Sequence, residues 1–87
     1  MEKELIKVLK AVANKRRIAI LKFLKKAQVA RVASIAEAIG LSFKATSKHL
    51  QILSGADILE KEQVSLSVNY SLAAKQHPII TKLISIL

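Results

Sequence analysis

The chain has 87 residues and a formal net charge of +9, and 52% of its residues are hydrophobic. This length fits one small domain over 1–87, whose core is only marginally stable by itself, so self-association is a natural supplement. The chain has no cysteine, which excludes disulfides, thiolate metal sites and thiol catalysis. It shows neither a signal-like segment nor an apolar run of membrane-spanning length, so we expect a cytoplasmic protein.

The positive charge is concentrated in the first part of the chain. Residues 1–54 hold twelve Lys and Arg against three acidic residues, whereas residues 55–87 hold three of each. A basic half joined to a neutral half suggests one charged working face, for which a polyanion is the natural partner. From charge alone, a solvated surface that keeps the protein in solution is the alternative.

Two amphipathic helices are predicted at the start of the chain. Residues 2–13 carry an apolar arc that includes Leu5 and Leu9, with lysines on the opposite side. A second helix follows over 15–27, and Asn14 is a good N-cap for it.

Arg17 projects from the apolar side of the second predicted helix. An unpaired guanidinium in such a place would be very costly, so Arg17 needs a partner. We expect a structural partner, and a phosphate contact is the alternative. The segment 28–31 is interpreted as a connector.

The central stretch, residues 32–54, is predicted to form a helix-turn-helix. Gly40 can adopt the positive φ that ends a helix abruptly, and Ser42 can cap the helix that follows. That second helix has one side that can pack and one polar, basic side, which is how such a motif presents a helix to the major groove. An ordinary helical hairpin in a core is the alternative. The residues expected at the DNA are Ser42, Phe43, Lys44, Ser47, Lys48 and Gln51.

The residue types on this side suit contacts with a duplex. Lys44 and Lys48 can reach phosphates or guanine edges, whereas Ser47 and Gln51 can form hydrogen bonds with phosphates or bases. Phe43 can contact a thymine methyl group, and packing against the preceding helix is the equal alternative. His49 lies on the packing side, where we expect it to donate one hydrogen bond in a half-buried site.

From residue 58 the hydrophobic pattern changes to a period of two. It predicts a β-hairpin over 58–72 with its tip near 62–65. Lys61 is the single cation of this hairpin and stands beside Glu60 and Glu62. We therefore expect Lys61 to make only a weak phosphate contact.

The last predicted helix spans 76–87, with Pro78 at a first helical position. Its apolar side is so broad that it would expose a large patch on a monomer. We expect a dimer seam that this helix forms with the first helix, and folding back onto its own domain is the alternative. The residues assigned to the seam are Leu5, Leu9, Ile79, Ile80, Leu83, Ile84 and Leu87.

The predicted order of helix, helix, helix-turn-helix, β-hairpin and helix is that of a winged helix-turn-helix domain, mainly α with a small hairpin. The chain resembles the ArsR/SmtB-type regulators, and the resemblance covers nearly all of it. It implies a homodimeric repressor that binds a palindromic operator, with two recognition helices in successive major grooves about 34 Å apart. The segments that carry it are 9–21, 35–42 with 47–53, and 57–60 with 69–72.

The chain departs from this family in two respects. Many members sense metals through cysteines on the first helix of the recognition unit, or through Asp, His and Glu on the last helix. Here residues 32–37 hold no cysteine, and the last helix offers only His77 near its start. We therefore expect neither a metal nor a cofactor. The family's wing also usually carries several basic residues and a glycine at its tip, and this hairpin lacks both.

Three classes of function can be compared. The first is a dimeric regulator that binds double-stranded DNA, with no membrane partner. The alternative is an architectural or machinery-docking protein of weak sequence specificity, which the poor wing and the missing sensor site favour. An enzyme has almost no support, because there is no Gly-rich phosphate loop and neither histidine has an evident carboxylate partner. RNA binding is disfavoured, because three aromatic residues provide no stacking surface.

Overall fold

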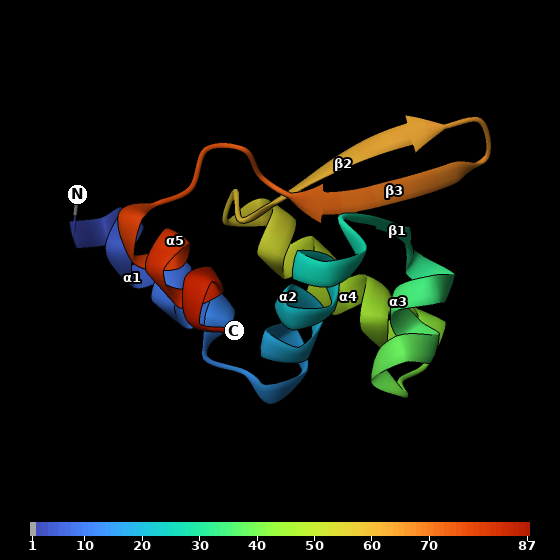
Figure 1. Ribbon diagram of the computed structural model, residues 1–87, viewed down its shortest axis with the longest axis horizontal. Coiled ribbons are helices and arrows are strands. Elements are labelled where there is room, and N and C mark those ends of the chain that lie inside the picture. Colours follow the sequence, from blue (N-terminus) through green and yellow to red (C-terminus); the bar gives the residue numbers. More distant parts are fainter. Residues whose placement is uncertain (1) are drawn as a thin grey trace.

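A computed structural model describes residues 2–87 and shows five helices and three strands (Figure 1). The predicted fold class, a mainly α winged helix-turn-helix, is confirmed. No helix among the described residues is long and apolar enough to span a membrane. The elements in chain order are α1 (Glu2–Val12), α2 (Lys15–Ala27), β1 (Val29–Arg31), α3 (Val32–Ile39), α4 (Phe43–Gly55), β2 (Leu59–Val64), β3 (Ser67–Leu72) and α5 (Pro78–Ile86).

Local capping sets the ends of the helices as predicted. The Asn14 side chain accepts hydrogen bonds from first-turn N–H groups of α2 at 2.9 and 3.1 Å. The N–H of Ala45 donates to Ser42 Oγ over 3.1 Å at the start of α4. Gly40 ends α3 with a φ of +66°, in the left-handed region that favours glycine. These caps position α3 and α4 as a helix-turn-helix.

The prediction of a connector over 28–31 is wrong for its last three residues, which form β1. Gln28 ends α2 with a φ of +73°, and the chain then pairs antiparallel with β3, with Ala30 opposite Tyr70. The sheet order is β1-β3-β2. Three residues are too few to show an alternating pattern. The sequence therefore does not reveal this strand, which is recognised only by its pairing with β3.

The hairpin tip also differs from the prediction. The turn falls at Ser65 and Leu66, since Val64 pairs with Ser67 across the hairpin. Ser65 takes a φ of +58°, which the sequence does not reveal because such turns usually carry Gly, Asn or Asp.

The core lies among α2, α3, α4 and the inner end of the sheet. Its completely buried side chains show less than 2% exposure. They come from α2, α3, α4, α5 and the residue before β2, and α1 adds Val8 and Ala11 at the margin. The largest are Ile20, Leu21, Leu24, Ile35, Leu50, Leu53, Ile58 and Ile80.

Arg17 is a structural residue, as expected. Its Nε donates to the carbonyl of Ala11, and its Nη2 donates to that of Lys10 over 3.4 Å. Its Nη1 donates to His49 Nδ1 over 3.1 Å. The guanidinium therefore joins the carboxyl end of α1 to the middle of α4. The prediction that His49 donates is wrong for this nitrogen, which must accept because arginine has only donors.

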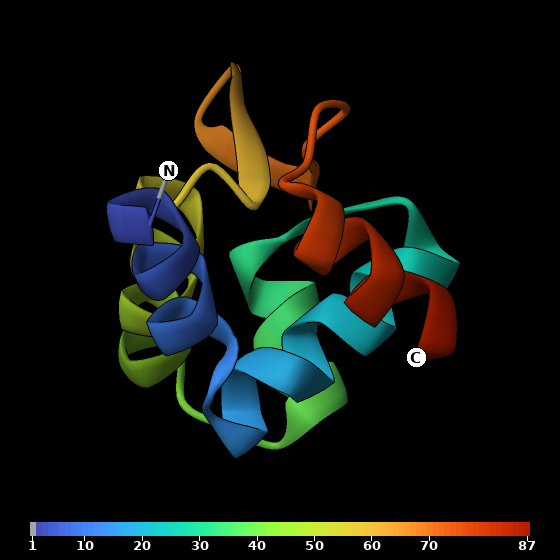
Figure 2. The same cartoon turned by 90° about the vertical axis from the view of Figure 1, so that its left-hand side faces the viewer.

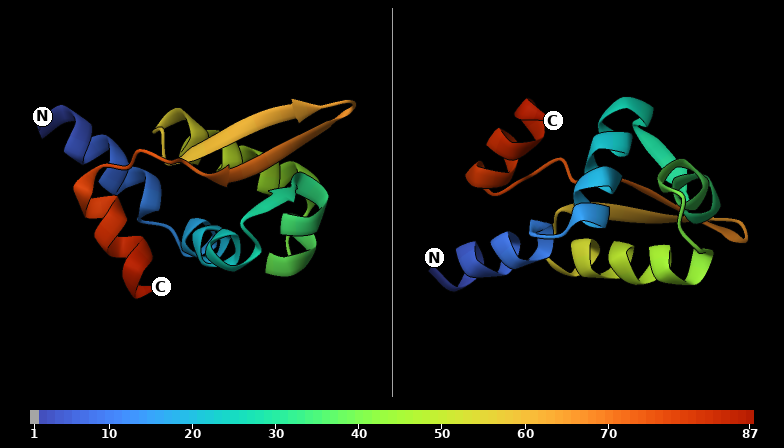
Figure 3. Two further views of the ribbon diagram at one scale, coloured as in Figure 1. Left: turned by 45° about the horizontal axis from the view of Figure 1, so that its top comes forward. Right: turned by 90° about the horizontal axis from the view of Figure 1, so that it is seen from below.

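The hairpin and the terminal helices lie at opposite ends of the molecule (Figures 1 and 2). The β2–β3 hairpin projects at one end, beyond α3, and the terminal helices α1 and α5 occupy the other. Figure 2 shows α1 next to α4, and α5 next to α2, in agreement with the contacts of these pairs. In the right-hand view of Figure 3, α4 and α5 lie on opposite sides of the molecule.

Candidate nucleic-acid interface

The side of α4 that sequence analysis assigned to DNA is open to solvent. The side chains of Lys44, Lys48 and Gln51 are exposed, and Ser42 is exposed at the N-cap. Phe43 is 60% exposed, so most of its surface is left uncovered by the rest of the domain. Ser47 is half-buried. The opposite side of α4 is fixed in the core by Thr46, Leu50 and Leu53, each 0% exposed.

The hairpin has two faces of different charge. Lys61 is paired with Tyr70 and Gln63 with Val68, and paired residues share a face of a sheet. Glu60 and Glu62 alternate with them and lie on the other face. The sequence places Lys61 between two acids, but the alternation of side chains along β2 puts Lys61 on one face and both acids on the other.

A cleft of about 700 Å³ lies between α4, the hairpin and the β1–α3 junction. Lys61 is brought together there with Phe43, Ser47 and Gln51, whereas Ser42, Lys44 and Lys48 are not among its lining residues. The full lining is Arg31, Val32, Ala33, Phe43, Ser47, Gln51, Lys61, Gln63, Leu66, Ser67, Val68 and Tyr70.

Eight of the residues that line this cleft were not expected from the sequence, and Arg31, Gln63 and Leu66 are the three that matter most for what the cleft can bind. Arg31 is exposed at the N-cap position of α3, where its side chain makes no capping hydrogen bond. It reaches the cleft because β1 pairs with β3, a contact that no local pattern signals. Gln63 shares the face of Lys61 by alternation along β2, so that signal could have found it, whereas the position of Leu66 is set by the turn.

The chemistry of the cleft suits a phosphate backbone. Two cations, Arg31 and Lys61, and four uncharged polar side chains line it, and no acidic residue is among its lining. Lysine and arginine that neutralise phosphates release counterions, which favours binding to a polyanion. Hydroxyl and amide groups contact phosphate and sugar oxygens as well.

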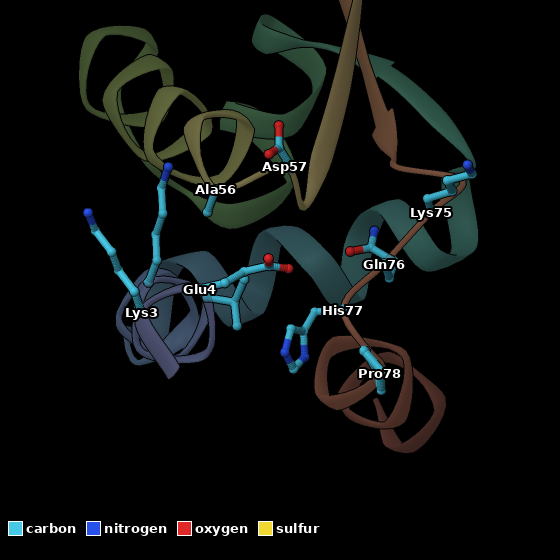
Figure 4. A pocket seen from close by; sticks show the side chains of 10 residues that line it. Lys3, Glu4, Ala56, Asp57, Lys75, Gln76, His77 and Pro78 are labelled. Carbon is cyan, nitrogen blue, oxygen red and sulfur yellow. The ribbon is translucent and has the colours of Figure 1, made fainter. Parts of the chain in front are cut away.

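A second cavity of about 630 Å³ lies at the other end of the molecule, between α1, the α4–β2 turn and the segment before α5 (Figure 4). Lys3 and Lys75 extend away from its middle, whereas Glu4 and His77 point into it. His77 Nδ1 accepts from the N–H of Ile79 over 3.2 Å, which caps α5. No group of three or more potential metal ligands occurs within residues 2–87. This cavity has mixed charge and is less suited to an anion.

The terminal helices present apolar side chains to solvent. Leu9 is 41% and Ile79 is 40% exposed. Leu5, Leu83, Ile84 and Leu87 are half-buried. The assignment of Ile80 to a dimer seam needs correction, because this side chain is 1% exposed and belongs to the core of its own chain. The helical period placed Ile80 on the apolar side of the last helix, but it could not show which part of that side the domain itself covers. Ile6 and Ile86, which sequence analysis did not assign to the seam, are 48% and 71% exposed.

Burial lowers the pKa of the His49 imidazole below its usual value, and the nearby guanidinium groups of Arg17 and Arg16 lower it further. The neutral form accepts the hydrogen bond from Arg17, so α4 carries no charge at this position on its packing side.

Solved structures of regulators share this fold. The chain is 27% identical to the homodimeric winged helix-turn-helix DNA-binding domain of Mb0332 from Mycobacterium bovis, described as a possible ArsR-family regulator, with a TM-score of 0.82 over 97% of this chain and 74% of that one. It is also 27% identical to reduced HlyU from Vibrio cholerae, with a TM-score of 0.83 over 99% of this chain and 86% of that one.

A comparison with curated protein sequences finds no match. The sequence profile described as "Bacterial regulatory protein, arsR family" matches residues 14–61, more than half of the chain. The matched region runs from the cap of α2 through the helix-turn-helix to Lys61 of the hairpin, and so includes the exposed side of α4. The chain belongs to the ArsR family of bacterial regulatory proteins.

Proposed function

We propose that this DNA-binding regulator is a repressor that binds a palindromic operator as a homodimer in the cytoplasm. The observation that supports it most strongly is the junction of the exposed, basic side of α4 with an acid-free cleft that holds Arg31 and Lys61. A dimer that occupies a promoter blocks transcription by excluding the polymerase, which requires no surface other than those for DNA and for the second copy.

The proposed contacts divide into two kinds. Lys44, Lys48, Ser47 and Gln51 enter the major groove, where they reach base edges and the flanking phosphates. Phe43 contacts a thymine methyl group, since its exposed ring lies at the start of α4. The remaining contacts, from Ser42, Lys61 and Arg31, are to phosphates.

Dimerisation gives the operator its symmetry. The M. bovis relative is described as homodimeric. In this chain, Leu9 on α1 and Ile79 on α5 leave apolar surface uncovered. We propose that these helices form the seam, together with Leu5, Leu83, Ile84 and Leu87. A two-fold axis there places the two α4 helices on successive major grooves of one face of the duplex, about 34 Å apart.

The proposed regulator works without the usual metal-sensing sites. The chain has no cysteine. Among residues 2–87, no cluster of His, Asp and Glu provides a metal site. We therefore expect a chelator to leave DNA binding unchanged.

Substitution of Lys48 tests the proposal. Anisotropy titrations with the protein's own promoter should show that Lys48→Ala weakens binding about tenfold and lowers the salt slope by about one per subunit, because phosphate contacts govern that slope. Lys82→Ala is the matched control, since Lys82 is an exposed lysine of α5, on the side of the molecule opposite α4. If Lys48→Ala keeps the affinity and salt slope of the Lys82→Ala control, Lys48 is not part of the interface.

The second candidate is a winged-helix architectural or docking protein of weak sequence specificity. The hairpin's single cation favours it. The promoter and a shuffled duplex of equal length, compared at one salt concentration, separate the two. A specific repressor should prefer the promoter by about 10³ or more.

A further inference from the structure

Leu66 occupies the tip of the β2–β3 hairpin and is almost uncovered. Its side chain is 98% exposed, more than that of any other large hydrophobic residue within 2–87. The turn that presents it is held in place, because Gln63 Nε2 donates to the carbonyl of Ser65 over 3.1 Å. The fold therefore holds an apolar side chain out in solvent on a defined turn.

Leu66 belongs to the same cleft as the proposed DNA contacts. It lines the cleft with Ser47 and Gln51 of α4 and with Lys61 of the hairpin. Val64, the other exposed apolar residue of the hairpin, is 46% exposed and is not among the lining residues. Leu66 therefore borders the cleft, whereas Val64 does not.

The position of Leu66 relative to Lys61 determines what it can reach. Three residue steps separate Lys61 from the end of β2, which corresponds to about 10 Å along a strand. The minor groove of B-DNA is about 6 Å wide. With α4 in the major groove and Lys61 at the phosphate backbone, this length is enough for the tip to cross that backbone into the adjacent minor groove.

We propose that Leu66 contacts base edges in this minor groove and selects A·T pairs there; the proposal rests on the proposed function above. Leucine is one of the apolar side chains that proteins insert at base steps from the minor groove. A G·C pair presents the guanine N2 amino group in this groove, whereas an A·T pair presents no donor. An apolar side chain would cover that amino group without offering an acceptor, which is costly.

Three variants test whether Leu66 touches DNA through apolar contact. The probe is a duplex that the wild-type protein selects from a random library. Leu66→Ala should bind it about fivefold to tenfold more weakly with an unchanged salt slope, because the lost contact is apolar. Leu66→Lys should steepen the slope by about one per subunit, because the added cation reaches phosphates. Val64→Ala is the control and should match the wild type.

A base-analogue series tests the A·T preference. Inosine has the major-groove edge of guanine but lacks its minor-groove N2 amino group. Where the hairpin protects the selected duplex, G·C in place of A·T should weaken wild-type binding about tenfold, and inosine·C should restore it. Leu66→Ala should bind the three duplexes within about twofold of each other. Equal wild-type binding to G·C and inosine·C, or preserved discrimination by Leu66→Ala, would overturn the proposal.

Two further results separate this proposal from the proposed function. If Lys48→Ala loses affinity while Leu66→Ala binds like the wild type, the minor-groove contact is wrong and the function stands. If the wild-type protein selects no duplex, the proposed function itself fails, and this inference fails with it. Sedimentation without DNA completes the design. Weaker self-association of Leu66→Ala would place Leu66 against a second copy and overturn the DNA contact.

Discussion

Thr46 is completely buried on the packing side of α4, with 0% exposure. Its hydroxyl has no hydrogen-bond partner among the residues that the structure describes. A buried hydroxyl without a partner loses its water contacts and gains nothing in exchange. The helical period is enough to place Thr46 on this side, but it does not show whether a hydroxyl finds an acceptor.

We predict that Thr46→Val raises the free energy of unfolding by about 1 kcal/mol, because valine keeps the branched shape and removes the unpaired hydroxyl. Urea denaturation measures this change. Thr81→Val, at an exposed position on α5, is the control and should change stability by less than about 0.5 kcal/mol. A destabilised Thr46→Val protein would mean that the hydroxyl has a partner, such as a buried water.

His49 gives the stability a dependence on pH. Its pKa is lowered in the folded state by burial, then by Arg17 and Arg16, whereas the unfolded chain takes up a proton near the ordinary value of 6.5. The unfolded state therefore binds more protons below about pH 6.5. The stabilisation that His49 provides is fully present above this pH and is lost as the pH falls through the lower, folded-state pKa.

We predict that the free energy of unfolding falls between pH 7.5 and pH 5, and that His49→Gln falls less over the same interval. Denaturation in urea at several pH values measures both slopes. Glutamine keeps a hydrogen-bond acceptor for Arg17 but does not titrate, so it isolates the contribution of the imidazole. Parallel slopes for the two proteins would exclude His49 as the titrating group.

Among the elements, α3 and α4 are the ones for which sequence reasoning works best. Gly40, Ser42 and the polar side of α4 are local signals, and each lies where the pattern predicts. Strand β1 and the cleft cannot be derived in this way, because Arg31 gains its position from the pairing of β1 with β3. Lys61 combines both kinds of signal: its separation from the neighbouring acids follows from the alternation along β2, whereas its place in the cleft depends on how the hairpin packs.

The turn between α3 and α4 requires a left-handed residue. Gly40 has a φ of +66°, and a Cβ placed there would meet no heavy atom within 4 Å. We therefore predict that Gly40→Ala lowers the free energy of unfolding by about 1–2 kcal/mol through backbone strain alone. Thermal unfolding followed by circular dichroism measures this loss.

Gly55 provides the matched control for Gly40. It lies at the end of α4, and a Cβ there would also meet no atom within 4 Å. Alanine in a helix is favoured over glycine by about 0.5–1 kcal/mol, so Gly55→Ala should be neutral or stabilising. Similar effects of the two substitutions would show that the backbone conformation at Gly40 does not determine the loss of stability in Gly40→Ala.

At the scale of the whole molecule, the terminal helices carry four exposed large apolar side chains, Ile6, Leu9, Ile79 and Ile86. Leu9 and Ile79 are each about two-fifths exposed, at 41% and 40%. Sequence analysis predicted this apolar side, but only packing shows that Ile80 is turned into the core while Ile79 is not. A chain of 87 residues has only a small core, so covering this surface in a dimer adds buried apolar area that the monomer lacks.

We predict that the double substitution Leu9→Ser with Ile79→Ser raises the dimer dissociation constant at least about tenfold, because each change removes apolar area from the seam. Sedimentation equilibrium measures the constant. Val29→Ser is the control, since Val29 is 54% exposed on β1, outside the terminal helices. A wild-type protein that is monomeric at micromolar concentration would contradict the seam.

The opposite faces of the hairpin have a consequence for the orientation in which the protein approaches a duplex. Lys61 lies on the face toward α4, and Glu60 and Glu62 lie on the outer face, so the hairpin carries a transverse electric dipole. In the field of a polyanion, this dipole attracts one face and repels the other over about a Debye length, close to 10 Å at moderate salt. A backward encounter is thus disfavoured before any base is contacted. The single cation of the hairpin therefore contributes more to the choice of orientation than to affinity.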